Sequence, residues 1–313
     1  MNSITKYLLA PIGGTYLFLK TCGILKRVIF GKKINDLKRK FNFVSNINID
    51  DISYDYGFCI ADNKNKEKYL FVVNINELGD TKSSFLSLDE NNDNNLKHIS
   101  KIVDFILLNI KPEEEIIFNI DSPGGSVIEY FYAYNHLKRL KDKGYKFNVF
   151  IKKIAASGGY LISSLAEKIY ATNEAYIGSV GVYTGDFNFS DLLNFLKIKY
   201  KLYKSGENKN MGDPYDVPNE EADKKIQKDI ENTHERFKKV VLENRKNVDM
   251  EKVKTADTWF ADEAKQIGLV DEIGNVNDYL LERAKKNIIK EIYYKNNEKQ
   301  SGGLFNLIAK LMQ

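Results

Sequence analysis

Short apolar runs that alternate with helix-like segments are the feature that most constrains the fold of this chain. Residues 115–120 (EIIFNI) and 147–151 (FNVFI) are typical of buried strands, and helices are predicted after them at 126–143 and 157–166. Each helix follows a glycine-containing turn, DSPGGS in the first case and AASGG in the second. Strands in alternation with helices predict an α/β domain with a largely parallel sheet.

The same pattern continues on both sides of these two units. Further strands are expected at 68–75, 169–171, 178–183 and 269–272, and further helices at 96–108, 218–246 and 261–267. Residues 87–95 are rich in asparagine and predict a loop insertion. The chain is therefore expected to have an N-terminal segment at 1–45, one large domain at 46–290, and a linker with an amphipathic helix at 291–313.

The positive charge of the chain is concentrated at its N-terminal end. The net charge is +4, but residues 1–40 hold nine Lys or Arg and a single acid, Asp36, so the rest of the chain is slightly acidic. Lysine outnumbers arginine by 41 to 6, whereas arginine is the preferred reader of phosphates and base edges. A nucleic-acid partner is therefore not expected. Two cysteines, Cys22 and Cys59, exclude a disulfide-rich scaffold and a zinc site with four cysteine ligands.

Residues 7–33 form an apolar and basic segment. Its uncharged run from 7 to 19 has 13 residues, fewer than the roughly 20 that span a bilayer as a helix, and it contains Pro11. We expect membrane association, spanning or interfacial, at a bacterial-type cell membrane. A cleaved signal peptide and a buried helix of the fold are the alternatives. If the segment spans, the basic residues at 26–33 would hold the following domain in the cytoplasm.

Two glycine turns contain residues that could do chemistry. Backbone N–H groups in DSPGGS could receive an anion or the oxyanion of an acyl-transfer intermediate, or the turn could simply join a strand to a helix. In the second turn, Ser157 could be a helix N-cap or a nucleophile presented at a strand-to-helix turn. The turn departs from the G-x-S-x-G pattern of α/β-hydrolases, because Ala155 stands at the first glycine position.

A nucleophilic serine needs a base that takes its proton. The chain has three histidines, His98, His136 and His234, and each is interpreted most simply as a surface or packing residue. The other option is a Ser–Lys dyad, in which a partly desolvated lysine loses its charge and accepts the serine proton. With 41 lysines, spacing alone does not select one.

Four segments together resemble the signal peptide peptidase A family (SppA and SohB), which are Ser–Lys peptidases of the ClpP/crotonase fold. They are IAASGGYLISSLAEKIYATNEAYIGSVGV at 154–182, DSPGG at 121–125, KSGENKNMGDP at 204–214 and WFADEAKQIGLVDEIG at 259–274. The segments occur in the family's order and spacing, and the similarity covers about residues 68–285. The resemblance implies an α/β fold of repeated β-β-α units with one catalytic domain.

The resemblance also implies roles for individual residues. Ser157 matches the nucleophile, Lys209 the general base, and Ser179 the serine that hydrogen-bonds and positions the lysine. Gly124 and Gly125 match the glycines that supply N–H groups to the oxyanion hole.

One position departs from the family pattern, because Asn210 stands where an Asp commonly follows the catalytic lysine. The change removes a negative charge that would favour the ammonium form, so it is compatible with a base, but it leaves the support of this loop open. The implied mechanism is acyl transfer. Neutral Lys209 takes the Ser157 proton, Ser157 attacks a peptide carbonyl, and water releases the acyl-enzyme. No metal, nucleotide or other cofactor is expected.

The resemblance therefore implies a membrane-associated serine endopeptidase that acts on signal-peptide remnants or unfolded peptides. Single-length relatives form rings in which neighbouring subunits bring the serine and lysine together. We expect a homo-oligomeric ring, with Lys209 acting within its own subunit or across an interface. Three alternatives stay open: a Ser–His–Asp peptidase on the same fold, a crotonase-like acyl-CoA enzyme, and a catalytically silent scaffold or binding module.

Overall fold

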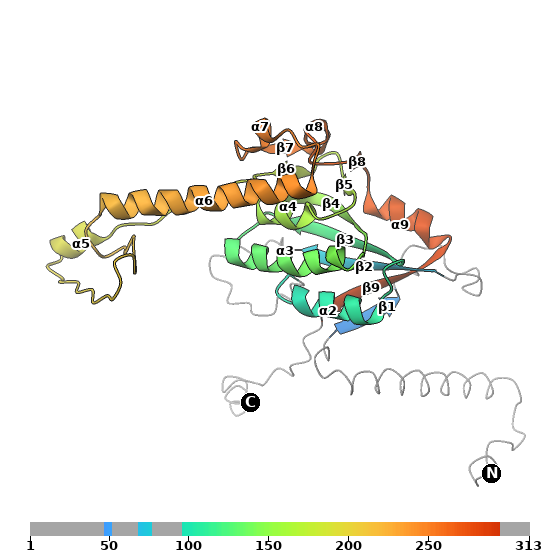
Figure 1. Cartoon of the computed structure of the whole chain (residues 1–313), viewed down its shortest axis with the longest axis horizontal. Coiled ribbons are helices and arrows are strands. Elements are labelled where there is room, and N and C mark those ends of the chain that lie inside the picture. Colours follow the sequence, from blue (N-terminus) through green and yellow to red (C-terminus); the bar gives the residue numbers. More distant parts are fainter. Residues whose placement is uncertain (1–46, 52–67, 77–95, 295–313) are drawn as a thin grey trace, which may run out of the picture. The chain divides into compact units, whose positions relative to one another are not determined.

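The computed structural model of the chain describes residues 47–51, 68–76 and 96–294, which lie in one compact unit beginning at Ile47 (Figure 1). The strands are β1 (Ile47–Asp51), β2 (Lys68–Asn76), β3 (Glu115–Ser122), β4 (Phe147–Ala156), β5 (Ile169–Ala171), β6 (Tyr176–Gly178), β7 (Thr258–Phe260), β8 (Glu272–Ile273) and β9 (Asn287–Tyr294). The helices are α2 (Ile99–Asn109), α3 (Val127–Asp142), α4 (Gly158–Ser163), α5 (Ser190–Phe195), α6 (Glu220–Asn244), α7 (Met250–Val253), α8 (Ala261–Gln266) and α9 (Val276–Ala284). The predicted membrane segment, the asparagine-rich loop at 87–95 and the tail from 295 lie outside the described residues.

The described strands form one sheet of nine strands in the order β1-β9-β2-β3-β4-β5-β8, with β6 paired to β4 and β7 paired to β6. All of these pairs are parallel except β1–β9 and β6–β7. The prediction of an α/β domain with a largely parallel sheet is confirmed. The order places β3 and β4, the two strands that lead into the glycine turns, side by side in the middle of the sheet.

Both faces of the central strands are buried, as a parallel sheet between helices requires. One face carries Leu70, Ile117 and Phe150, which pack with Leu280 of α9 and Ile289 of β9. The alternate residues of β2 point to the opposite face and are buried too, where α2, α3 and α4 lie next to one another (Figure 1). Burial of each large aliphatic side chain contributes about 1.5–3 kcal/mol, so this core holds the two central strands in fixed register.

The predicted strand at 178–183 is wrong over most of its length. Strand β6 ends at Gly178, and Ser179 takes a φ of +50°, which breaks the extended chain. The predicted strand at 269–272 survives only as the two-residue strand β8, and it is not the last element. Helix α9 and strand β9 follow it, and β9 runs past the predicted domain end at 290 to Tyr294.

Helix α6 extends from the sheet as an arm, with α5 and the connecting loops at its outer end (Figure 1). We call residues 183–244 the arm. Helix α6 has 25 residues and is therefore about 37 Å long. Its inner, C-terminal end is anchored to the core by Phe237 and Val241, which are buried, and by the ion pair of Arg245 with Asp271 at 2.7 Å. The outer end begins at Asn219, whose side chain accepts the N–H groups of the first helical turn.

Candidate active site

Ser157 lies at the junction of β4 and α4, and its backbone is strained. Its φ and ψ are +51° and −123°, a combination that costs a non-glycine residue about 1–3 kcal/mol. The Ser157 N–H donates to the Gly178 carbonyl at 2.9 Å, which fixes this conformation. Although Ser157 precedes α4, its side chain makes no capping hydrogen bond. Ser157 therefore occupies the N-cap position of α4, but its hydroxyl does not cap the helix, and the residue is half-exposed.

The DSPGG turn lies directly against Ser157. A Cβ added to Gly124, which has a φ of +90°, would lie 2.7 Å from the Ser157 Cβ and 2.8 Å from the Gly158 nitrogen. Only glycine permits this approach. The Gly124 N–H donates to the Ser122 Oγ at 3.1 Å, so in this conformation it is engaged away from an incoming carbonyl. Of the two glycines predicted for the oxyanion hole, Gly125 is the exposed one.

Asp121, the first residue of the DSPGG turn, has a structural role that the sequence does not indicate. Its buried carboxylate accepts N–H groups of β4 at Lys152 (3.2 Å), Lys153 (2.7 Å) and Ile154 (3.4 Å). The β3–β4 register shifts at this place, so these N–H groups would otherwise lack a strand partner. Asp121 thereby supports the irregular end of the strand that carries Ser157.

Ser179 lies beside Ser157. Strands β4 and β6 pair Ala156 with Gly178, so the two serines follow paired positions in neighbouring strands. Ser179 also has a left-handed backbone, with a φ of +50°, and its N–H donates to the Asp257 carbonyl at 2.7 Å. Two strained, half-buried serines therefore stand at the same edge of the sheet, next to the DSPGG turn.

None of the three histidines is bonded to Ser157. His98, which directly precedes α2, stacks on Tyr294, and His136 lies on α3 beside Arg139. Burial, with the nearby Arg139 charge, lowers the pKa of His136 below its ordinary value. His234 is the nearest to the site, but its Nε2 donates to the Val180 carbonyl at 2.8 Å. The interpretation of all three as packing or surface residues agrees with these contacts.

Lys209 is not brought to Ser157 within one chain. It is exposed in the loop at the outer end of the arm, and its N–H donates to the Gly206 carbonyl. Gly212 of this loop packs on Ile226 of α6, whereas His234 of the same helix contacts the Ser179 segment. Eight residues separate these two points, about 12 Å along the helix axis. No hydrogen bond between described residues joins Lys209 to either serine.

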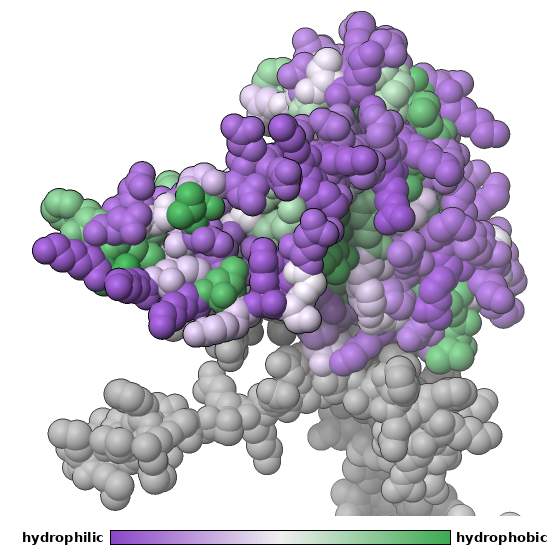
Figure 2. Space-filling model, turned by 60° about the vertical axis from the view of Figure 1, so that its left-hand side comes forward, coloured by the Kyte–Doolittle hydropathy of each residue, from purple (hydrophilic) through white to green (hydrophobic). Residues whose placement is uncertain are grey.

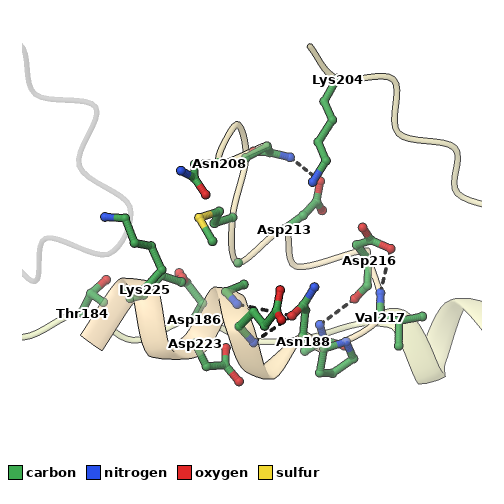
Figure 3. A pocket seen from close by; sticks show the side chains of 18 of the residues that line it. Thr184, Asp186, Asn188, Lys204, Asn208, Asp213, Asp216, Val217, Asp223 and Lys225 are labelled. Atoms are coloured by element: carbon green, nitrogen blue, oxygen red, sulfur yellow. Dashed lines mark hydrogen bonds between the residues drawn. The ribbon is translucent and has the colours of Figure 1, made fainter. Parts of the chain in front are cut away.

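The Lys209 loop lies over the first turns of α6 (Figure 3). Between the loop and the helix is a cavity of about 600 Å³ that opens to solvent. Polar residues line most of it, among them Asp186, Asp216 and Lys225. Within the described residues, no group of three or more His, Cys, Asp or Glu side chains could hold a metal ion. None of the helices described there is long and apolar enough to cross a membrane.

Comparison with known proteins finds similarity to peptidases. Residues 139–290 match the model of Peptidase family S49. Two proteins named as the protease SohB are similar to it, one from Haemophilus influenzae (36% identical, 60% of this chain and 54% of the relative) and one from Buchnera aphidicola (31%, 74% and 65%). A signal peptide peptidase SppA of Enterococcus faecium is 36% identical over 60% of this chain and 56% of the relative.

The chain contains a Peptidase family S49 region and is similar to proteases of the SppA and SohB kind. Its α/β sheet is the ClpP/crotonase-like fold expected for this S49 family. The chain spans between about half and two thirds of the length of the relatives it matches. The S49 match covers Ser157, Ser179 and Lys209 but begins after the DSPGG turn.

Two residues of the site escaped the sequence analysis. Asp121 was treated only as part of a glycine turn, because the N–H groups that it accepts lie 31–33 residues further along the chain. Gly158 has no distinguishing signal in the sequence, because it follows Ser157 as one of two glycines. As the first residue of α4 its N–H has no partner within the helix, and its nitrogen lies close to the DSPGG turn.

Proposed function

We propose that this chain is a serine endopeptidase in which Ser157 is the nucleophile and Lys209 is the general base. The observation that carries the proposal is Ser157 itself, a strained and half-exposed serine whose hydroxyl caps no helix. Strain of this kind persists only where surrounding contacts impose it, and it is concentrated at functional sites. Here the contacts are the Gly178 carbonyl and the DSPGG turn.

The proposed reaction is acyl transfer to Ser157. Neutral Lys209 accepts the hydroxyl proton at Nζ while Oγ attacks the peptide carbonyl carbon. The N–H groups of Gly125 and Gly158 stabilise the oxyanion, and the lysine then returns the proton to the leaving amine. Water attacks the acyl-enzyme with Lys209 again as base. Ser179, next to Ser157, holds the incoming Lys209 Nζ by a hydrogen bond.

Because Lys209 lies on the arm, we propose that it serves the Ser157 of a neighbouring copy in a homo-oligomeric ring. The arm carries large apolar side chains that are exposed in the single chain, and exposed apolar patches of this kind mark interaction sites (Figure 2). Four aromatic residues of the arm are more than 80% exposed: Tyr183, Phe187, Phe195 and Tyr203. A head-to-tail contact that repeats around a ring would bury them in every copy.

The proposed substrates are signal-peptide remnants or unfolded peptides, in keeping with the names of the relatives, a protease and a signal peptide peptidase. Membrane association through residues 7–33 is part of the same proposal. No nucleic-acid partner and no cofactor are proposed.

A fluorophosphonate probe tests the nucleophile. The full-length protein is expected to be labelled, and Ser157→Ala is expected to abolish labelling and peptide hydrolysis together. Ser126→Ala, which changes an exposed serine at the other turn, is the matched control and should label as the parent does. Labelling that persists in Ser157→Ala would dismiss the nucleophile. Absence of labelling in the parent would favour the catalytically silent scaffold.

Mixing two inactive variants tests the shared site. Ser157→Ala keeps the lysine and Lys209→Ala keeps the serine, so a shared interface can combine one intact residue from each. Random mixing within a cyclic ring should restore about a quarter of the parental activity. Activity that does not return, despite ring formation by light scattering, would show that each chain uses its own lysine.

A further inference from the structure

Lys209 lies in a loop outside the strands and helices of the fold. The backbone around it turns repeatedly, and Asn210, the next residue, has a left-handed φ of +61°. Among the described residues, Lys209 makes one backbone hydrogen bond, from its N–H to the Gly206 carbonyl at 3.2 Å. If this lysine is to reach a neighbour's serine in a defined direction, side-chain contacts must fix the loop.

Asp213 makes those contacts. It is only 9% exposed although the loop around it faces solvent. Its carboxylate accepts the Tyr200 hydroxyl at 2.6 Å, the Tyr215 N–H at 2.9 Å and the Asn210 side-chain amide. The Tyr200 hydroxyl, followed by the Tyr215 N–H and the Asn210 amide, lowers the pKa of Asp213. A charged acceptor with three donors is the strongest polar link in this loop.

Asn210 connects Asp213 to the lysine, because it directly follows Lys209 and its side chain bonds Asp213. Asparagine tolerates the left-handed conformation better than most residues, and its amide provides the donor that Asp213 receives. An aspartate at 210 would face Asp213 with a second carboxylate, and the two would repel. The asparagine that departs from the family pattern therefore matches the aspartate three residues later.

We infer that Asp213 is a positioning residue: through Asn210 and Tyr200 it fixes the direction in which the arm presents Lys209. The inference rests on the proposed function, because it assumes that Lys209 is the base. It adds a reason why this chain carries the pair Asn210 and Asp213.

An exchange of the two side chains tests the inference in the full-length protein. Asp213→Asn removes the acceptor charge and Asn210→Asp creates the repulsion, so each is expected to lower kcat about 10- to 100-fold with KM unchanged. The double variant Asn210→Asp/Asp213→Asn restores one carboxylate and one amide and is expected to recover kcat to within about fivefold of the parent. Tyr200→Phe removes one donor and should give an intermediate loss. Asp216→Asn is the matched control, because it removes a charge from the same loop without touching Asn210.

The results separate this inference from the proposed function. If Lys209→Ala abolishes hydrolysis while Asp213→Asn keeps kcat within twofold, the lysine is the base and the positioning role is wrong. A double variant whose kcat is no higher than that of the less active single variant, with ring formation intact, would also overturn the inference. If Lys209→Ala leaves hydrolysis unchanged, the proposed function itself fails. Recovery in the double variant supports the inference, since general damage to the fold would add rather than cancel.

Discussion

Gly124→Ala tests how closely the DSPGG turn must approach the nucleophile. The new methyl group would lie 2.7 Å from the Ser157 Cβ, 2.8 Å from the Gly158 nitrogen and 2.9 Å from the Ala156 carbonyl oxygen. Two of these three atoms are backbone, so no rotation of a side chain relieves the clash. The turn must therefore move away from Ser157, and the adjacent Gly125 N–H must move with it.

Gly144→Ala separates the effect of this contact from that of the backbone conformation. Gly144 has a φ of +84°, close to the +90° of Gly124, but nothing lies within 4 Å of its added Cβ. A left-handed alanine costs about 1–2 kcal/mol at either position. Overpacking adds about 1–3 kcal/mol at Gly124 alone. The difference in free energy of unfolding between the two variants should therefore be about 1–3 kcal/mol, equivalent to about 2–4 °C in Tm for each kcal/mol.

Urea unfolding and the rate of fluorophosphonate labelling measure the two consequences. Gly144→Ala should label at the parental rate, whereas loss of an oxyanion donor in Gly124→Ala should slow labelling about 100-fold. Equal stability losses in the two variants would refute the close contact. A full labelling rate in a folded Gly124→Ala protein would refute the oxyanion assignment of this turn.

The remaining predictions concern the arm. Asp271→Asn breaks the ion pair of the nearly buried Arg245 and should destabilise the protein by about 2–5 kcal/mol in thermal unfolding, whereas Glu272→Gln, which breaks an exposed pair, should change Tm little. Hydrogen bonding lowers the folded-state pKa of Asp213, so its carboxylate stabilises the loop fully above pH about 4. This stabilisation is lost as the pH falls through the lower folded-state pKa. Hydrogen exchange of residues 206–215 should therefore give the same protection at pH 7 and pH 5; a loss of protection at pH 5 would contradict the assignment.

The parts of the fold that local pattern controls could be predicted from the sequence. The central strands contain the apolar runs IIF in β3 and VFI in β4, and the helix predicted at 126–143 is observed at Val127–Asp142. Strand β9 was missed because its sequence, NIIKEIYY, mixes charges with apolar residues; the sheet buries the apolar ones between β1 and β2. The error at 178–183 has a different origin, since the left-handed turn at Ser179 depends on the Asp257 carbonyl, far away in sequence.

The candidate site also contains some residues that local sequence indicates and others that it does not. Ser157 and Gly124 were accessible to sequence reasoning, because each lies in a short glycine motif that directly follows a strand. Lys209 came only from the resemblance, since nothing local distinguishes it from other loop lysines. Asp213 had one local signal, a turn-like NMGDP sequence, but its donor Tyr200 lies 13 residues away and could not be paired with it beforehand.

The two residues of the proposed dyad are held in place by different parts of the structure, and this difference bears on regulation. Ser157 is held in a strained conformation by the buried sheet and by Asp121, so every folded copy contains it in a ready state. Lys209 is held on an exposed arm by a polar cluster that needs no contact with the core. Within the described part of a single copy, the proposed nucleophile thus lies apart from the proposed base. If the dyad is shared between copies, hydrolysis begins only on assembly, and an isolated chain in the cell would be protected from cleaving peptides prematurely.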